Sequence, residues 1–494
     1  MMMIKKNIRQ IYAISSGKCG KLVVDKKSLI CLPGLLTLIP SGIFLAVGLF
    51  NPELHRHSWT FDHEEHTILL TILLFHIGAI AGAAITVLLL PTYYKQHIAR
   101  FYYYAYIGAG VLLAARFYDL WSILIARIIG GMAFGSVYLT IVIHAGEIAA
   151  DDFRTTVVAF VSIFLMIGYL MHATINSLIM HDDAMEPTQI YGIVAILAGV
   201  FSGLSATFLT RESPFFLLKR EGEASAADTI AKLRQEPIDS TVVFAELVEV
   251  KITVRNDPEE HGSIHKERNL RPLILLIVCA IVKALCFNLI LNLLQLYVVD
   301  EVNFWWNIEE YNIAPVLLIL IRLAIAVLWI RTEDKLPKKL LFTLTSFFSG
   351  AILVGTGVCY LTDNDLSAST TVPLFCVYQL VSASGTSFIG DVFCSEAFSP
   401  KKKILSVAVV QSVEQLVHIV VLSVAFSPKF SLHRGIFGEI LLVAGVPVLV
   451  GSIVLQLLLP ETKNMSLRMA RAEFEQKEKI SSRRAKWCVK TCTI

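Results

Sequence analysis

The sequence predicts an all-α membrane protein with twelve transmembrane helices in two six-helix halves. Three observations support this prediction. Apolar stretches of membrane-spanning length recur along nearly all of the 494 residues, Lys and Arg gather on one side of them, and the two halves repeat a charged pattern. A soluble core is excluded, because these stretches match the ~20 residues that an α-helix needs to cross a bilayer.

Six predicted spans make each half. The first six begin near Ser28, Thr67, Phe101, Leu120, Thr155 and Gln189, and the second six near Pro272, Asn312, Leu340, Thr371, Ile404 and Gly435. The third span holds Arg116 and Asp119 near its end, so we expect a tight turn at the membrane edge before the fourth.

The basic residues orient these spans. Of the 43 Lys and Arg, 36 fall on one side and only Arg56, Arg116, Lys429 and Arg434 fall on the other. The positive-inside rule makes the basic side cytoplasmic, so both termini are predicted to be cytosolic. The expected location of this multi-pass protein is the plasma membrane, with an intracellular membrane as the alternative. This orientation accounts for the formal charge of +3, and nothing in it suggests a nucleic-acid partner.

Five regions follow. We expect a cytosolic tail over 1–27, a six-helix bundle over 28–210, a cytosolic loop over 211–271, a second bundle over 272–460 and a cytosolic tail over 461–494. Within the loop, residues 215–234 and 241–255 mix apolar and charged side chains at helical spacing, which predicts short helices; a solvated linker is the alternative.

A charged pattern repeats after the fourth span of each half. Glu147 precedes Arg154 by seven residues in the first half, and Glu396 precedes Lys403 by seven in the second. Equivalent loops in two halves are typical of transporters built from internal repeats.

The chain resembles the sugar-porter branch of the major facilitator superfamily from about Ser28 to Asn464, and insect facilitated trehalose transporters most of all. The residues that carry the resemblance are Arg127, Gly131, Gly135, Glu147 and Arg154, the runs Arg211 to Pro214 and Pro460 to Lys463, and the loop from Asp334 to Lys339. The resemblance implies a major facilitator fold with a central cavity exposed alternately to each side.

Charged residues at cytosolic helix ends form the expected gate, since they can pair across the halves when that side closes. Each exposed pair contributes only ~0 to 1 kcal/mol, which keeps closure reversible. The gating set is Arg127, Glu147, Arg154, Glu212, Asp334, Lys338, Lys339, Glu396, Lys403 and Glu461. Simple positive-inside anchoring is the alternative, above all for Lys403. One gating loop is degenerate, because Pro91 to Gln96 replaces the Asp-Arg-x-Gly-Arg-Arg run of the family.

The resemblance also implies a substrate site whose chemistry has changed. The expected substrate-binding residues are Ser162, Lys283, Asn288, Asn292, Gln295, Arg322, Asp391 and Glu414. Family glutamines become Ser162 and Lys283, and family asparagines become Arg322 and Glu414, whereas Asn288 is retained. The stripe of Asn288, Asn292 and Gln295 suits hydroxyl recognition, although ordinary interhelical hydrogen bonding is the alternative. Lys283 lies about 140° from Asn288 on an ideal helix, so it joins the cavity only if span seven is broken.

Three charges are expected near the midplane. Lys283, Arg322 and Glu414 lie 11 or 12 residues from a cytosolic helix end, roughly 16 to 18 Å deep. Each costs ~2.5 to 3.5 kcal/mol there unless it is paired or hydrated. Either Lys283 and Arg322 form a static network with Asp391 and Glu414, or one member stays free for a charged solute.

Facilitated diffusion is favoured over proton coupling, because residues 28–51 contain no acid to face Arg127; Asp391, Glu414, His172 and His418 leave another proton route open. The predicted function is facilitated transport of a small polar solute, first a sugar or polyol. A carrier of a charged or zwitterionic organic solute and a non-transporting sensor are the alternatives. No enzymatic motif, metal cluster or cofactor site appears at usable spacing, so the expected partners are a small molecule and the bilayer, for a monomer.

Overall fold

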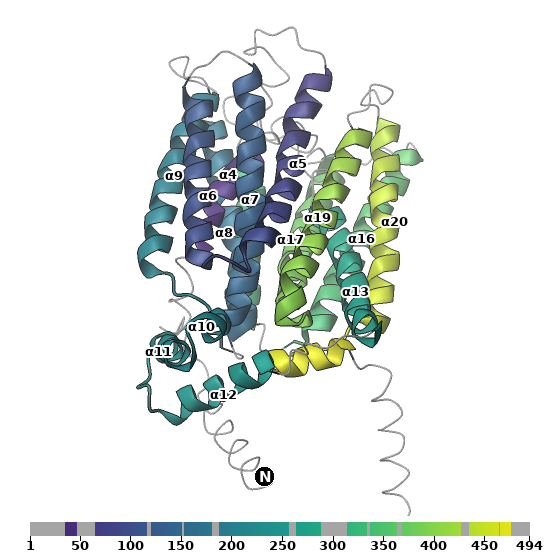
Figure 1. Cartoon of the computed structure of the whole chain (residues 1–494). Helices are drawn as coiled ribbons and strands as arrows, with labels where there is room; N and C mark the ends of the chain where they lie inside the picture. Colours follow the sequence, from purple (N-terminus) through teal and green to yellow (C-terminus); the bar gives the residue numbers. More distant parts are fainter. Residues whose placement is uncertain are drawn as a thin grey trace, which may run out of the picture.

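The computed structural model describes residues 35–46, 65–115, 120–150, 153–179, 187–255, 263–287, 314–332, 336–362, 368–425, 434–463 and 465–475. All regular secondary structure in these ranges is helical. Figure 1 shows two groups of upright helices standing side by side, with shorter helices lying across one end. We call that end the α10–α12 end and the opposite one the far end.

The first half contains α4 to α9. Their bounds are Leu38–Ala46, Glu65–Leu89, Lys95–Ala114, Leu120–Ile148, Arg154–Ile179 and Pro187–Leu209. The third helix, α6, begins six residues before the predicted Phe101, so the α5–α6 connection is a short turn over 90–94. The predicted turn at Arg116 and Asp119 lies outside the described residues.

The second half contains α13 and α15 to α20. Their bounds are Ser263–Phe287, Ala314–Thr332, Lys338–Leu361, Ala368–Ser384, Ile389–Ala397, Pro400–Ala425 and Arg434–Leu458. Eight helices in the described part of the chain are long and apolar enough to cross a membrane.

The tenth span is broken, which corrects the expectation of one continuous helix. Helix α17 ends at Ser384 and α18 begins at Ile389. The hydroxyl of Ser162, on α8 of the first half, donates to the carbonyl of Ser387 at 2.9 Å. A carbonyl freed by the break is thus satisfied from the other half, as an irregular backbone buried in a membrane protein requires.

Three short helices occupy the predicted central loop: α10 (Pro214–Arg220), α11 (Glu223–Arg234) and α12 (Thr241–Arg255). They share a small core of their own that includes Ile230 and Val243. Arg234 pairs with Glu246 at 2.6 Å and donates to the carbonyl of Ile148 at 3.0 Å. Since Ile148 ends α7, this arginine satisfies a free helix-terminal carbonyl and fastens the loop to the first half.

Close helix packing in the first half depends on glycine. A Cβ atom at Gly135 of α7 would lie 1.9 Å from the carbonyl oxygen of Ala79 on α5, and one at Gly82 of α5 would lie 2.0 Å from that of Met132. Small residues at such points let two helix backbones approach in a membrane, where packing replaces the hydrophobic effect as the driving force.

We therefore expect Gly135→Ala to destabilise the protein by about 1 to 3 kcal/mol, because α5 and α7 must separate to admit the methyl group. Thermal unfolding in detergent measures the loss. Gly108→Ala on α6 is the matched control, since a Cβ there meets no atom within 4 Å. Equal melting of the two variants would contradict the packing.

The two halves touch at the far end through apolar side chains. Helix α5 starts at this end, because the turn that follows its other terminus contacts α10. The far-end cluster consists of Ala46, Ile72, Ala173, Ile319 and Leu422. The first three belong to the first half and the last two to the second, so apolar side chains join the halves here.

Candidate functional site

A buried ion cluster lies at the middle of the second half. Lys283 of α13 places its Nζ 2.8 Å from Oδ1 of Asp391 on α18 and 3.3 Å from the carboxylate of Glu414 on α19. The side chains of Lys283 and Asp391 are 8% and 6% exposed. We call these three residues the central triad. It satisfies one cation with two acids, and Oδ2 of Asp391 has no hydrogen-bond partner among the described residues.

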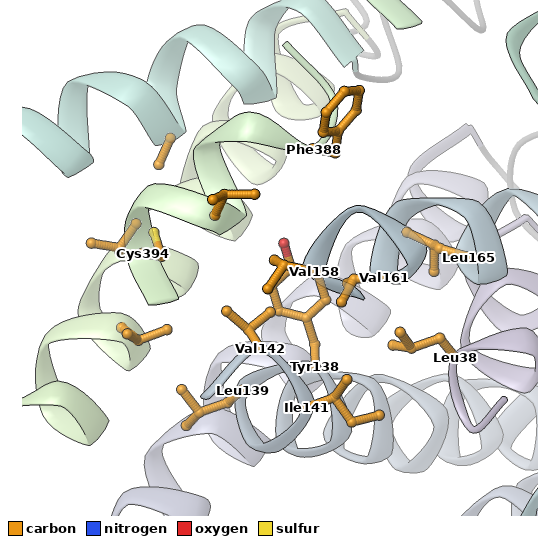
Figure 2. Packing of buried hydrophobic residues seen from close by; sticks show 14 of the residues in the cluster. Leu38, Tyr138, Leu139, Ile141, Val142, Val158, Val161, Leu165, Phe388 and Cys394 are labelled. Carbon is orange, nitrogen blue, oxygen red and sulfur yellow. The ribbon is translucent and has the colours of Figure 1, made fainter. Parts of the chain in front are cut away.

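Tyr138 connects the first half to this triad. Its hydroxyl accepts from Lys283 Nζ at 2.7 Å and donates to Asp391 Oδ1 at 2.5 Å. Figure 2 shows the Tyr138 hydroxyl directed from α7 toward the segment that carries Phe388 and Cys394. The sequence analysis did not identify Tyr138 as part of this cluster. A tyrosine on an apolar helix, one turn from Phe134, has the same sequence pattern whether it joins a polar cluster or packs in the core.

Arg322 stands apart from the triad. Its Nη2 donates to Ser382 Oγ at 3.2 Å, and its guanidinium lies 4.4 Å from the centre of the Phe287 ring. No ion pair joins it to a carboxylate within the described residues. A single static network of two cations and two anions is therefore wrong: the structure joins three of the four charges and leaves Arg322 out.

Other polar contacts line the seam between the halves. His76 of α5 lies 2.8 Å from Gln415 Oε1 and stacks on His418, both on α19. Gln411 of α19 donates to the carbonyl of Gly135 at 3.0 Å. Together with Tyr138 and Ser162, these contacts place polar groups between the halves along much of their depth.

Other predicted residues either lie outside the described residues or lie elsewhere in the first half. Asn288, Asn292, Gln295 and Asp334 lie outside the described residues. Helix α13 is continuous through Lys283 to Phe287, and Lys283 contacts Tyr138 of the first half, so the expectation that Lys283 needs a break there is wrong. A break beyond Phe287 stays a prediction. Arg127 is fully buried and donates to the carbonyls of Thr71 at 3.0 Å and of Phe44. It thus contacts backbone of α4 and α5 inside the first half, away from the charged residues at the α10–α12 end.

At the α10–α12 end, an ion-pair layer joins the halves. We use this name for Lys95, Glu147, Arg154, Lys338, Glu396 and Lys403. Arg154 Nη1 of the first half lies 3.7 Å from Glu396 Oε1 of the second, and Lys338 Nζ lies 2.9 Å from the same oxygen. Thr462 donates to the other Glu396 oxygen at 2.7 Å. Glu396 is 1% exposed, so this pairing is far better shielded than a surface salt bridge.

The repeat's other acid, Glu147, has partners from the first half and from the start of the central loop. Lys95 Nζ and Ser213 Oγ each lie 2.5 Å from its Oε2. Glu212, beside Ser213, accepts from the Ser213 backbone N–H at 3.0 Å. Lys403 of the second half is 4% exposed and interacts electrostatically with Glu147. Both acids of the repeat thus face basic residues of the opposite half, Glu396 at closer range.

Within the described part of the chain, Glu461 binds backbone N–H groups instead of pairing with a cationic side chain. Its two carboxylate oxygens accept the backbone N–H groups of Lys338 and Lys339 at 3.1 and 3.0 Å. These N–H groups open α16 and have no intrahelical partner, so Glu461 caps the helix. Lys339 takes part through its backbone, whereas Lys338 adds its side chain to the ion-pair layer.

The turn that lacks the family motif still makes dense contacts. Arg220 of α10 lies over the rings of Tyr94 and Phe216 at 5.2 and 5.8 Å, and the Tyr94 hydroxyl donates to Glu221 at 2.6 Å. Hydrogen bonds from Ser225 and Tyr94 lower the pKa of the Glu221 carboxyl. Lys95 and these aromatic contacts fasten the turn to Glu147 and α10, although the motif that normally predicts such contacts is absent.

The C-terminal segment crosses under both halves. Residues 467–475 form a helix, drawn in yellow across the α10–α12 end in Figure 1. The Met465 carbonyl accepts from Arg154 Nη1 at 3.3 Å, and the buried Phe474 ring lies 6.1 Å from that of Phe393 on α18. The segment therefore supports the Arg154–Glu396 contact.

Comparisons with known proteins agree with this architecture. The profile of the family described as "Sugar (and other) transporter" matches residues 30–474. The chain is also similar to "Solute carrier family 2, facilitated glucose transporter member 7" of Mus musculus, with 23% identity over 212 residues. That match covers 42% of this chain and 40% of the relative, less than half of its length.

Solved structures match over a much greater length. The major facilitator superfamily proton:xylose symporter XylE bound to 6-bromo-6-deoxy-D-glucose gives a TM-score of 0.77 at 18% identity, covering 90% of this chain and 98% of that one. A partially occluded inward open conformation of XylE from E. coli gives 0.69 at 17% identity, covering 90% and 100%. The predicted fold class, two six-helix bundles of the major facilitator type, is confirmed.

Proposed function

We propose that this chain, which belongs to the sugar (and other) transporter family, carries a sugar or polyol across a membrane by alternating access. Its similarity to a facilitated glucose transporter and to a proton:xylose symporter supports the substrate class.

One observation carries the proposal: polar side chains from both halves meet between two levels of contact. Tyr138 and the central triad lie buried between the two ends of the helices. On one side of them the halves touch through the far-end cluster, and on the other side through the ion-pair layer. A carrier needs polar groups for its solute within the membrane and contacts on each side that separate in turn.

We place the α10–α12 end in the cytosol and the protein in the plasma membrane. The positive-inside rule supports this orientation, because the central loop and both tails carry most of the Lys and Arg. Both termini are then cytosolic. The motif resemblance to insect trehalose transporters makes trehalose the first sugar to test.

We further propose facilitated rather than proton-coupled movement. The Arg127 guanidinium donates to backbone carbonyls, and residues 28–51 offer it no acid. The titratable residues that interact with this arginine in the described part of the first half are His76, His172 and Tyr169, and they include no carboxylate to form an acid–arginine proton relay.

Proteoliposomes that contain the full chain test this function. We expect saturable uptake of a labelled sugar or polyol from a panel that includes trehalose, glucose, xylose and inositol. Uptake is expected to be faster when the same unlabelled solute is inside, because the loaded carrier then returns occupied. An imposed pH gradient is expected to leave the rate unchanged.

Two results would contradict the proposal. Folded protein that moves no member of the panel would argue for a non-transporting relative of the family. Uptake that accumulates the solute only under an inward proton gradient would replace facilitated diffusion by proton coupling.

A further inference from the structure

Arg322 is a buried cation that no acid neutralises in the described part of the chain. It is 7% exposed, its hydrogen bond is to the hydroxyl of Ser382, and its Nε has no partner there. Lys283, at the same expected depth, faces two carboxylates. Lys283 is therefore neutralised by acids, whereas Arg322 is not neutralised within the described residues.

The sequence holds no other acid that suits Arg322. Asp391 and Glu414 are the acids that lie well inside a predicted span, and Lys283 engages both. In the sequence, the acids of the remaining segments fall in the connections between the predicted spans or in the predicted tails. An uncompensated guanidinium at this depth is costly, and its cation–π contact with Phe287 offsets only part of that cost.

Arg322 also lies where the two halves meet. Ile319, one turn before it, belongs to the far-end cluster. Ala326, one turn after it, packs with Ile163 and Met166 of α8 in the first half. Tyr169 of α8 and Tyr378 of α17 lie close enough to interact electrostatically with the guanidinium. The free Nε is thus held at the seam that a moving solute must pass.

We propose that Arg322 binds the carboxylate of the transported solute, and that this solute is an acidic sugar such as a uronate or aldonate. A planar guanidinium presents paired N–H donors that match a carboxylate. Lys283 is already neutralised by Asp391 and Glu414, so Arg322 offers a single uncompensated positive charge. A single charge matches a monoanion better than a phosphate dianion. This inference rests on the proposed sugar transport and names the charge of the sugar.

The test compares two probes of nearly equal size, D-glucuronate and its neutral analogue D-glucuronamide. Binding of each to the purified full chain is measured by titration calorimetry, and uptake of each in proteoliposomes. We expect wild-type protein to bind glucuronate at least tenfold tighter than glucuronamide. Arg322→Gln is expected to reduce this preference to within twofold, and Arg322→Lys to keep part of it.

Lys232→Gln is the matched control, because it removes the same charge from a side chain of α11 that is 51% exposed. It is expected to keep the full preference. Equal binding of the two probes by wild-type protein overturns the inference, as does a preference that survives Arg322→Gln. If that variant does not fold, the wild-type comparison and Arg322→Lys still decide.

The outcomes separate this inference from the proposed function. Uptake of neutral sugars without glucuronate binding overturns the acidic substrate and leaves sugar transport standing. Arg322-dependent binding of glucuronate without any flux supports the site and contradicts transport. Folded protein that neither binds nor moves any probe overturns both.

Discussion

Replacing Lys283 with Met is expected to cost about 3 to 5 kcal/mol of stability, because it leaves Asp391 and Glu414 buried with no cation. The loss is comparable with the entire ~5 to 15 kcal/mol that stabilises a typical domain. Lys283 Nζ also donates to Tyr138, so the contact between the halves weakens with it. A large fall in the melting temperature of detergent-solubilised protein, or loss of monodisperse protein, measures the effect.

A second variant separates charge from packing. Asp391→Asn in the Lys283→Met background removes one of the two stranded acids and is expected to recover part of the stability. Lys232→Met, which breaks an exposed pair with Asp228, is expected to cost at most about 1 kcal/mol. If Lys283→Met melts with wild-type protein, or the double variant is worse than the single one, the triad does not hold the second half together.

The depth of these charges could be predicted from the sequence, but their partners could not. Helix rise is constant, so counting residues from a helix end puts Lys283 and Arg322 at one level. Which cation meets an acid depends on the rotation of each helix and on α18, whose separation from α17 was not predicted. Residues 382–387 are a run of Ser, Ala, Gly and Thr, so the sequence does carry a signal for that break, which the prediction of the span did not use.

For the ion-pair layer too, the sequence predicted some members and not others. The repeated spacing identified Glu147 and Glu396 together with Arg154 and Lys403, because equivalent loops in two related halves carry equivalent charges. It could not identify Lys95, Ser213 or Thr462, which reach the acids from other connections. Lys95 in particular follows the turn that lacks the family motif and was described as a degenerate gating loop, yet its Nζ lies 2.5 Å from Glu147 Oε2.

Removing Glu396 is expected to open the α10–α12 end far more than removing Arg154. Glu396 accepts from Lys338 and Thr462 and faces Arg154, so Glu396→Gln strands two buried cations. A cost of about 3 kcal/mol to the closed state raises the open population about a hundredfold. Arg154→Gln loses the 3.7 Å contact with Glu396 and the hydrogen bonds to the carbonyls of Gly146 and Met465. It strands no buried cation and leaves the closer Lys338–Glu396 pair intact, so we expect a rise of about tenfold or less.

Cys394 supplies a native reporter of this opening. It is a buried free cysteine on α18, two residues before Glu396, and its thiol becomes reachable when the halves part at this end. Its rate of reaction with a polar maleimide, read site by site by mass spectrometry, is expected to rise about a hundredfold in Glu396→Gln, with the partly exposed Cys359 as internal reference. Equal rates in the two variants would mean that Arg154 alone closes this end. Unchanged rates in both would mean that the apolar contacts of the seam, such as Phe474 on Phe393, keep it closed without the charges.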